Sequence, residues 1–255
     1  MEKIEVPLKI NGLFIKAHFY KDDIEDIFRP FLLRLKDQAR RKKRLIVFMA
    51  GAPGAGKSTL VAFLEMLAEE MGISLQAIGI DGFHHYDSYL KSHYIADDKE
   101  KGLLYTIKGA PCTFDVKRLS EKLKELKEHD IYWPIYDRIA HDPKEDAIFV
   151  DANIVLIEGN YLLLDDEAWR DLKEYADLTI YLDVKKEDLK DDLIKRKMQS
   201  GLSYDATLAH YARVDARNHD LIASKLLKSD IVFKIDKDRH ITLEDSTYFL
   251  LDKKI

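Results

Sequence analysis

The chain has 255 residues, 46% hydrophobic and 34% charged, a balance typical of folded globular proteins that excludes extended disorder. Its 41 basic and 46 acidic side chains give a net charge of −5, which argues against nucleic acid or an anionic membrane as the main partner. The single cysteine, Cys112, cannot form an internal disulfide. Because the first residues lack a signal-peptide pattern and no apolar stretch approaches the roughly 20 residues of a membrane span, we expect a cytoplasmic protein.

The first elements in chain order are a β-hairpin and a helix. Residues 4–10 and 13–20 flank Asn11-Gly12, a strong hairpin signal because both residues tolerate positive φ. Apolar residues then recur at helical spacing over 24–35, and Pro30 within this run predicts a kink or a new helix start. The basic cluster 40–44 is interpreted as the solvated C-terminal end of that helix.

From residue 45 onward, short apolar segments alternate with amphipathic ones. Buried strands are predicted over 45–50, 75–80, 154–157 and 178–182, and helices over 58–71, 116–126 and 189–198. Such alternation indicates parallel βαβ units in a sheet covered on both faces. With no repeat and no linker composition, we predict one α/β domain over residues 1–255.

Residues 51–58, the phosphate loop, read GAPGAGKS and match the pattern GxxxxGK[ST] in full, between a predicted strand and a predicted helix. Glycines let backbone N–H groups surround phosphate oxygens at a helix N-terminus. Lys57 is expected to reach the β- and γ-phosphates of ATP, and the Ser58 hydroxyl to bind Mg²⁺. This predicts a three-layer P-loop NTPase fold with a mostly parallel central sheet, plus a short N-terminal β-hairpin and helix. The predicted nucleotide-binding residues are Gly51, Ala52, Pro53, Gly54, Ala55, Gly56, Lys57, Ser58 and Thr59.

Two carboxylates follow predicted strands, Asp81 after 75–80 and Glu158 after 154–157. In open α/β sheets the carboxyl ends of the strands surround the ligand crevice. One carboxylate there can take a proton from an acceptor hydroxyl, and another can hold Mg²⁺ directly or through water. Each residue can also be an ordinary turn or cap residue, so both interpretations stay open at this point.

Two absent motifs and one long irregular segment indicate which class of P-loop protein this chain resembles. The base-reading NKxD motif of GTPases and the LSGGQ signature of transporter ATPases are absent from the sequence. Residues 82–114 have weak periodicity and many Tyr, His and Lys residues, and so long a segment between regular elements is usually functional.

The segments GAPGAGKST, IDGFHH, KGAPCTFD, WPIYDRIAHDP and VLIEGNYLL, in this order, resemble the uridine kinase, phosphoribulokinase and bacterial pantothenate kinase superfamily. Within it the chain most resembles a largely uncharacterised branch, some of whose members are labelled fructose-transport-system kinases. The resemblance covers residues 45–235, the expected kinase core, between an extension over 1–44 and a C-terminal segment over 236–255. It implies ATP-dependent phosphorylation of a small-molecule hydroxyl on a sugar, nucleoside or pantothenate-like acid, and it allows a homodimer.

The resemblance also implies roles for single residues. Asp81 matches the catalytic base of uridine and pantothenate kinases, and Glu158 matches the glutamate that assists Mg²⁺. Tyr136 and His141 match residues that contact the nucleoside in uridine kinases. The family's lid supplies cations to the transferred phosphate from the helix that contains residues 195–197, and Arg196 is the preferred candidate on guanidinium geometry.

The chain departs from the uridine kinase pattern at the acceptor. Arg138 stands where uridine kinases place an aromatic residue against the base, and His84-His85 replaces the usual aromatic pattern. We therefore expect an acceptor with a carboxylate or phosphate that Arg138 contacts. The alternative is that Arg138 only braces its loop through Asp137 or Asp142.

Two further residues, His84 and Lys108, are predicted to bind the acceptor, with a solvated surface position as the alternative for each. A regulatory ATPase is the rival function, although it would need neither an acceptor base nor a substrate loop. A nucleoside monophosphate kinase is a nearer alternative, but residues 82–114 contain none of the arginines that usually surround an acceptor phosphate.

Overall fold

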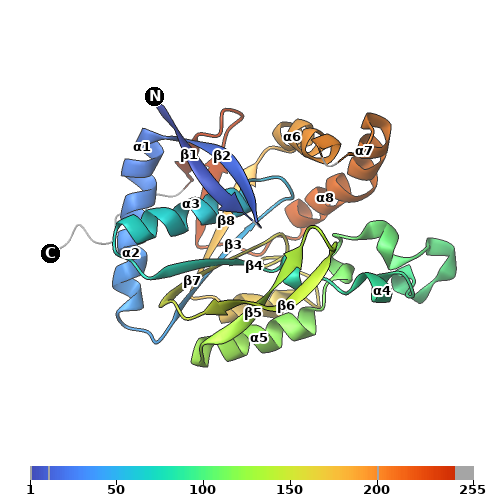
Figure 1. The fold of residues 1–255 in the computed structure, drawn as a ribbon, viewed down its shortest axis with the longest axis horizontal. Coiled ribbons are helices and arrows are strands. Elements are labelled where there is room, and N and C mark those ends of the chain that lie inside the picture. The colour runs from blue at the N-terminus through green and yellow to red at the C-terminus, as the bar shows by residue number, and fades with distance from the viewer. Residues whose placement is uncertain (1, 11, 200, 245–255) are drawn as a thin grey trace.

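The computed structural model describes residues 2–10, 12–199 and 201–244, apart from the side chains of Leu13, Arg196 and Gln199 (Figure 1). Within this part of the chain, the central sheet has six strands in the order β10-β9-β8-β3-β7-β4. All neighbouring strands are parallel except β10, which pairs antiparallel with β9. The prediction of a mostly parallel sheet is confirmed. The strands are β3 (Leu45–Gly51), β4 (Leu75–Gly79), β7 (Ile154–Gly159), β8 (Leu178–Val184), β9 (Ile231–Ile235) and β10 (Ile241–Leu243).

Helices cover both faces of this sheet because its central strand is apolar throughout. Every residue of β3 is buried, and alternate side chains point to opposite faces. Val47 and Met49 belong to one hydrophobic cluster, with α2 (Arg29–Ala39) and α3 (Lys57–Glu70), whereas Ile46 and Phe48 belong to a second, with α5 (Val116–Glu128). The apolar side chains on both faces of β3 therefore account for the three-layer arrangement.

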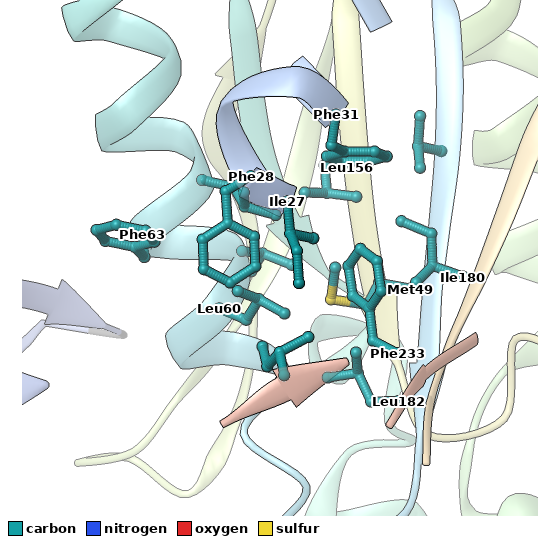
Figure 2. Packing of buried hydrophobic residues seen from close by; sticks show 14 of the residues in the cluster. Ile27, Phe28, Phe31, Met49, Leu60, Phe63, Leu156, Ile180, Leu182 and Phe233 are labelled. Carbon is teal, nitrogen blue, oxygen red and sulfur yellow. The ribbon is translucent and has the colours of Figure 1, made fainter. Parts of the chain in front are cut away.

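The N-terminal extension packs onto the same core as α3. Its hairpin pairs β1 (Lys3–Ile10) with β2 (Leu13–Tyr20), and its turn contains Gly12 with φ +83°, while Asn11 lies outside the described residues. In the first cluster, Phe28 lies against Phe63 of α3 at 5.7 Å between ring centres, and Phe31 lies 6.0 Å from Phe233 of β9 (Figure 2).

Pro30, where a kink or a new helix start was predicted, lies just after a π-helical turn, and the backbone stays helical through Phe28 and Arg29. The short helix α1 (Lys21–Asp23) continues as a π-helical turn over Ile24–Phe28, and α2 begins at Arg29 with the proline in its first turn. Proline lacks the N–H that an internal helical turn requires, so it is tolerated where a helix begins.

Several elements were not predicted from the sequence, among them the strands β9 and β10 and the helices over Tyr204–His210 and Ala216–Ser224. Residues 131–150 form an antiparallel hairpin, β5 (Ile131–Asp137) and β6 (Asp142–Val150), which the sequence did not predict because Pro134 and a register shift between Trp133 and Ile135 interrupt its alternation. The long segment after β4 folds into short turns: α4 (Asp87–Leu90) and the 3₁₀ helices Asp81–Phe83, Ile95–Asp97, Lys99–Lys101, Leu104–Ile107 and Pro111–Thr113. It projects from one side of the molecule in Figure 1.

The C-terminal third adds helices beside the sheet edge at which the phosphate loop lies. After the 3₁₀ helix Arg170–Tyr175 come α6 (Lys186–Gln199), α7 (Tyr204–His210), a π-helical turn over Tyr211–Asp215 and α8 (Ala216–Ser224). The helix expected over 189–198 is α6. Residues 245–255 of the predicted C-terminal segment lie outside the description, and no helix among the described residues is long and apolar enough to cross a membrane.

Candidate active site

The phosphate loop connects the central strand β3 to helix α3. Its backbone enters the left-handed region at Gly54 (φ +81°) and Gly56 (φ +93°), which favours glycine. At Gly54 a Cβ atom would also lie only 2.9 Å from Cγ of Leu193 in α6. Gly56 directly precedes α3, so the loop lies at the positive N-terminal end of that helix, where anions bind.

The Lys57 side chain is buried and folds back over the loop. Its Nζ donates hydrogen bonds to the carbonyl oxygens of Gly51 (2.9 Å) and Ala52 (3.0 Å) and to Oδ1 of Asn160 (2.6 Å). These hydrogen bonds hold the ammonium group at the phosphate loop. Sequence reasoning missed Asn160, although its position two residues after Glu158, at the end of β7, was a usable signal.

Glu158 lies within β7 rather than after it, and its carboxylate faces the loop. The Ser58 hydroxyl donates to Oε1 of Glu158 at 2.7 Å. A Cβ atom at Gly79 of β4 would lie 3.3 Å from the same oxygen, so the neighbouring strand leaves room for this side chain. Burial raises the pKa of Glu158, and the charge of Asp81 adds to the rise, whereas Lys57, Ser58 and Arg138 oppose it.

The Ser58 hydroxyl oxygen and the Glu158 carboxylate oxygen lie close enough to bind one metal ion. Both are hard oxygen ligands, the type that Mg²⁺ prefers. The raised pKa of the Glu158 carboxyl indicates that its ionised form lacks full compensation by the protein alone. A divalent cation would supply that compensation. The residues present at the loop therefore fit the predicted metal.

Asp81 begins the 3₁₀ helix after β4 and so lies at the same sheet edge as Glu158. Its backbone carbonyl closes this turn by accepting the N–H of His84 at 3.2 Å, but among the described residues its carboxylate caps no helix and accepts no hydrogen bond. Its neighbour Gly82 faces the β5 backbone, where a Cβ atom would lie 2.4 Å from the carbonyl oxygen of Pro134. Glycine is required there because the hairpin passes so closely.

Gly82→Ala is therefore expected to destabilise the protein by about 2 kcal/mol or more, because its Cβ meets main chain that cannot turn aside. Urea denaturation followed by circular dichroism measures the change in unfolding free energy. Ser88→Ala, at an exposed position of α4, is the control and should change it little. An unchanged stability of Gly82→Ala would show that the hairpin does not press on this turn.

Tyr136 and Lys108 meet at one backbone oxygen. The carbonyl of His141, a residue with φ +56°, accepts from the Tyr136 hydroxyl at 2.7 Å and from Lys108 Nζ at 2.8 Å. Lys108 also forms an ion pair with Asp87. Burial alone would lower the pKa of Lys108, but its hydrogen bonds and charge interactions with Asp87 and Tyr136 together outweigh burial and raise the pKa. Lys108 is therefore not a solvated loop lysine, and His141 contributes its carbonyl here while its side chain is exposed.

His84 lies in the interior of this cluster rather than at the surface. Its ring centre is 3.8 Å from that of Phe114 and 5.5 Å from that of Tyr136, and Nδ1 lies 2.8 Å from the backbone oxygen of Asp81. Because a carbonyl oxygen only accepts, Nδ1 carries the proton and Nε2 is left as an acceptor. Burial lowers the pKa of His84, which favours this neutral form.

Arg138 is exposed at the tip of the β5–β6 hairpin, and its charge acts on Glu158. The two acids that could brace it are bonded to backbone instead. Asp137 Oδ1 accepts from the N–H groups of Ile139 (2.8 Å) and Ala140 (3.0 Å). Asp142 Oδ1 accepts from the N–H of Asp87 at 2.7 Å. No ion pair of Arg138 is found among the described residues, so the bracing interpretation has no support in the geometry.

The predicted lid cations lie on α6. The side chain of Arg196 is outside the described residues, so its predicted role stays a prediction. Lys195 is exposed, whereas Lys197 is half-buried with Nζ 3.9 Å from Oδ2 of Asp215. A second missed residue, Tyr161, donates its hydroxyl to the carbonyl of Gly109 at 2.6 Å and so ties the KGAP segment to the end of β7.

A parallel sheet whose central strand leads into a glycine-rich loop and a helix, with acidic side chains at the ends of two adjacent strands, defines the P-loop phosphotransferases. The chain belongs to the phosphoribulokinase/uridine kinase family, whose model matches residues 46–242. It is therefore an ATP-dependent kinase of the P-loop class, and the family resemblance predicted from its motifs is confirmed.

Individual relatives agree with this placement. The chain is 37% identical over 239 residues to the uncharacterized protein YggC of Escherichia coli, covering 92% of this chain and 97% of the relative. It is 30% identical over 210 residues to a candidate uridine kinase, C227.14, of Schizosaccharomyces pombe, covering 79% and 87%. A crystal structure of a candidate fructose transport system kinase from Silicibacter sp. TM1040 is similar with a TM-score of 0.71 and 32% identity, covering 81% of this chain and 97% of that one.

Proposed function

We propose that this kinase transfers the γ-phosphate of ATP to a hydroxyl of a small metabolite that carries a carboxylate or a phosphate. The observation that carries the proposal is the position of Arg138. It is an exposed cation at the tip of the β5–β6 hairpin, without an ion pair among the described residues, and it is the weakest of the groups that oppose the raised pKa of Glu158. A guanidinium group suits planar, bidentate recognition of such anions.

The nucleotide half of the reaction belongs to the phosphate loop. Its backbone N–H groups and the N-terminus of α3 bind the phosphates, and Lys57 is held where the β- and γ-phosphates arrive. Ser58 and Glu158 would hold Mg²⁺, which when bound neutralises charge on the phosphate oxygens. Arg196 on α6 is the proposed second cation for the transferred group.

The acceptor half lies across the site, on the segment after β4 and the β5–β6 hairpin. Asp81, whose carboxylate is not engaged with backbone, takes the proton from the acceptor hydroxyl as the new P–O bond forms. His84, Lys108 and Tyr136 line the approach with one ring nitrogen acceptor, one ammonium and one phenol. Lys108, whose charge is already paired with Asp87, is proposed to contribute a hydrogen bond to the acceptor.

Arg138→Leu is expected to raise the KM of the acceptor by about tenfold or more, because a charge-assisted bidentate contact is lost. The KM of ATP and the melting temperature should stay close to wild type, since Arg138 braces nothing among the described residues. Steady-state kinetics with each substrate varied separately make this distinction. Lys144→Leu, on the exposed part of β6, is the matched control.

The acceptor class is tested by a thermal-shift screen of hydroxy acids, sugar phosphates, neutral sugars and nucleosides, with Mg²⁺ and a non-hydrolysable ATP analogue. The proposal predicts that the largest stabilisation comes from an anionic compound and disappears in Arg138→Leu. A neutral sugar or an unmodified nucleoside as the best ligand, with an unchanged KM in the variant, would contradict it. An unmodified nucleoside as the best ligand would match the name of the Schizosaccharomyces pombe relative, a candidate uridine kinase.

A further inference from the structure

The turn between β9 and β10, residues 236–240, reaches the phosphate loop through one side chain. Nη1 of Arg239 donates to the carbonyl oxygen of Ala55 at 3.3 Å, and its Nη2 pairs with Asp192 of α6. Arg239 itself has φ +67°, so the turn presents this side chain from a backbone conformation that non-glycine residues seldom adopt. The contact joins the β9–β10 turn to the middle of the phosphate loop.

Holding the Ala55 carbonyl has a consequence for the next amide group. In a trans peptide the C=O of one residue and the N–H of the next point in opposite directions. Because Arg239 approaches from the carbonyl side, the N–H of Gly56 points away from it, in the opposite direction within the same peptide plane. Gly56, with φ +93°, offers little resistance to rotation of this peptide on its own. The guanidinium group of Arg239 therefore restrains the Ala55–Gly56 peptide, which would otherwise be free to rotate.

Residues of the N-terminal extension hold the β9–β10 turn in place. Asp23, only 3% exposed, accepts the backbone N–H of Ile241 on Oδ2 at 3.0 Å and contacts Nε2 of His240 with Oδ1 at 3.1 Å. Both carboxylate oxygens thus bind the two residues that directly follow Arg239. Lys3 of β1 adds a hydrogen bond from Nζ to the carbonyl of Asp238 at 3.0 Å.

We infer that Asp23 and Arg239 are positioning residues for nucleotide binding. Asp23 sets the β9–β10 turn in place, and Arg239 then holds the Ala55 carbonyl so that the phosphate loop keeps its binding conformation. The extension, which precedes the region matched by the family model, is thereby a working part of the nucleotide site. This inference rests on the proposed nucleotide role of the loop and is independent of the acceptor.

The test measures binding of ADP and of inorganic tripolyphosphate to the full chain by isothermal titration calorimetry. Arg239→Gln is expected to raise the Kd of both ligands about tenfold, as for the loss of a hydrogen bond from a charged donor. Asp23→Asn should raise both by about three- to tenfold. In the Arg239→Gln background Asp23→Asn should add less than about twofold, because it acts through the arginine.

Controls separate this coupling from a general loss of structure. Lys16→Gln removes a surface ion pair with Glu5 in the same extension and should leave both Kd values unchanged. Arg239→Lys should recover part of the affinity, since an ammonium group keeps one donor for the carbonyl. His240→Ala leaves the bond from Ile241 to Asp23 intact, so it tests the same coupling with less cost to folding.

Three results would overturn the inference. The first is that Arg239→Gln and Asp23→Asn each bind both ligands with a Kd within about twofold of wild type. The second is that the fold-changes in Kd of the two single variants multiply in the double variant, which would mean that the two residues act independently. The third is weakened binding of ADP with unchanged binding of tripolyphosphate. That result would indicate that Arg239 contacts the adenine base and does not position the phosphate loop. A wild-type chain that bound neither ligand would instead overturn the nucleotide assignment itself, and the inference with it.

Discussion

Lys57→Ala is expected to lower phosphoryl transfer by about 10³-fold or more, because removing a cation from the transferred phosphate costs on that order in P-loop enzymes. The structure adds a cost that the sequence alone did not indicate. The Lys57 ammonium satisfies the carbonyls of Gly51 and Ala52, so its loss should also lower the free energy of unfolding by about 1–3 kcal/mol. Turnover is measured by coupled detection of ADP, and stability by urea denaturation.

Asn160→Ala is the matched variant for this prediction. It removes one of the acceptors that hold the Lys57 ammonium but leaves the charge in place. Its effect on turnover should therefore be much smaller than that of Lys57→Ala. An unaltered rate in a folded Lys57→Ala protein would remove the phosphate-loop assignment, whatever the variant did to stability.

Asp81→Asn is expected to lower kcat on the order of 10²–10⁴-fold, the usual effect of losing a general base. The amide keeps the size and shape of the side chain but cannot take the proton of the acceptor hydroxyl. Affinity for ATP should change little, since the phosphates are bound by the loop and not by the segment after β4. Separate measurement of kcat and of the KM for ATP tests both statements.

Asp97→Asn is a suitable control, because Asp97 is exposed and its φ of +55° is one that asparagine also tolerates. It should leave both constants unchanged. If Asp81→Asn lost ATP binding but retained its rate with saturating ATP, Asp81 would be a metal ligand or a structural residue instead of the base.

Four of the six described strands of the central sheet, β3, β4, β7 and β8, could be predicted because they are mostly apolar. The runs that form β3, β7 and β8 are buried on both faces, so composition alone distinguishes them from their surroundings. The β5–β6 hairpin was missed for the opposite reason. Its half-buried residues, its two prolines and its register shift remove the alternation that would mark a strand. The end of β7 was also placed too early, since backbone pairing continues through Glu158.

The site was predictable where a local motif carries the chemistry, and not where distant segments meet. Asp81 and Glu158 could be proposed from the sequence because each lies at or near the end of a strand, and their roles stay predictions. That Lys108 would share one carbonyl with Tyr136 depends on how two loops fold together. The contact between Asp23 and His240 depends on the packing of the chain's first helix against its last strands. Spacing within the sequence contains no signal for either.

The most direct test of the proposed reaction is the stoichiometry of its products with the acceptor that the screen identifies. Mass spectrometry follows the phosphorylated acceptor while ADP is measured in the same samples, with wild type and Asp81→Asn side by side. We predict one phosphorylated anionic acceptor for each ADP formed, no reaction without Mg²⁺, and loss of both products in the variant. ADP released at the same rate with and without any acceptor, and equally in Asp81→Asn, would contradict the account and indicate a regulatory ATPase.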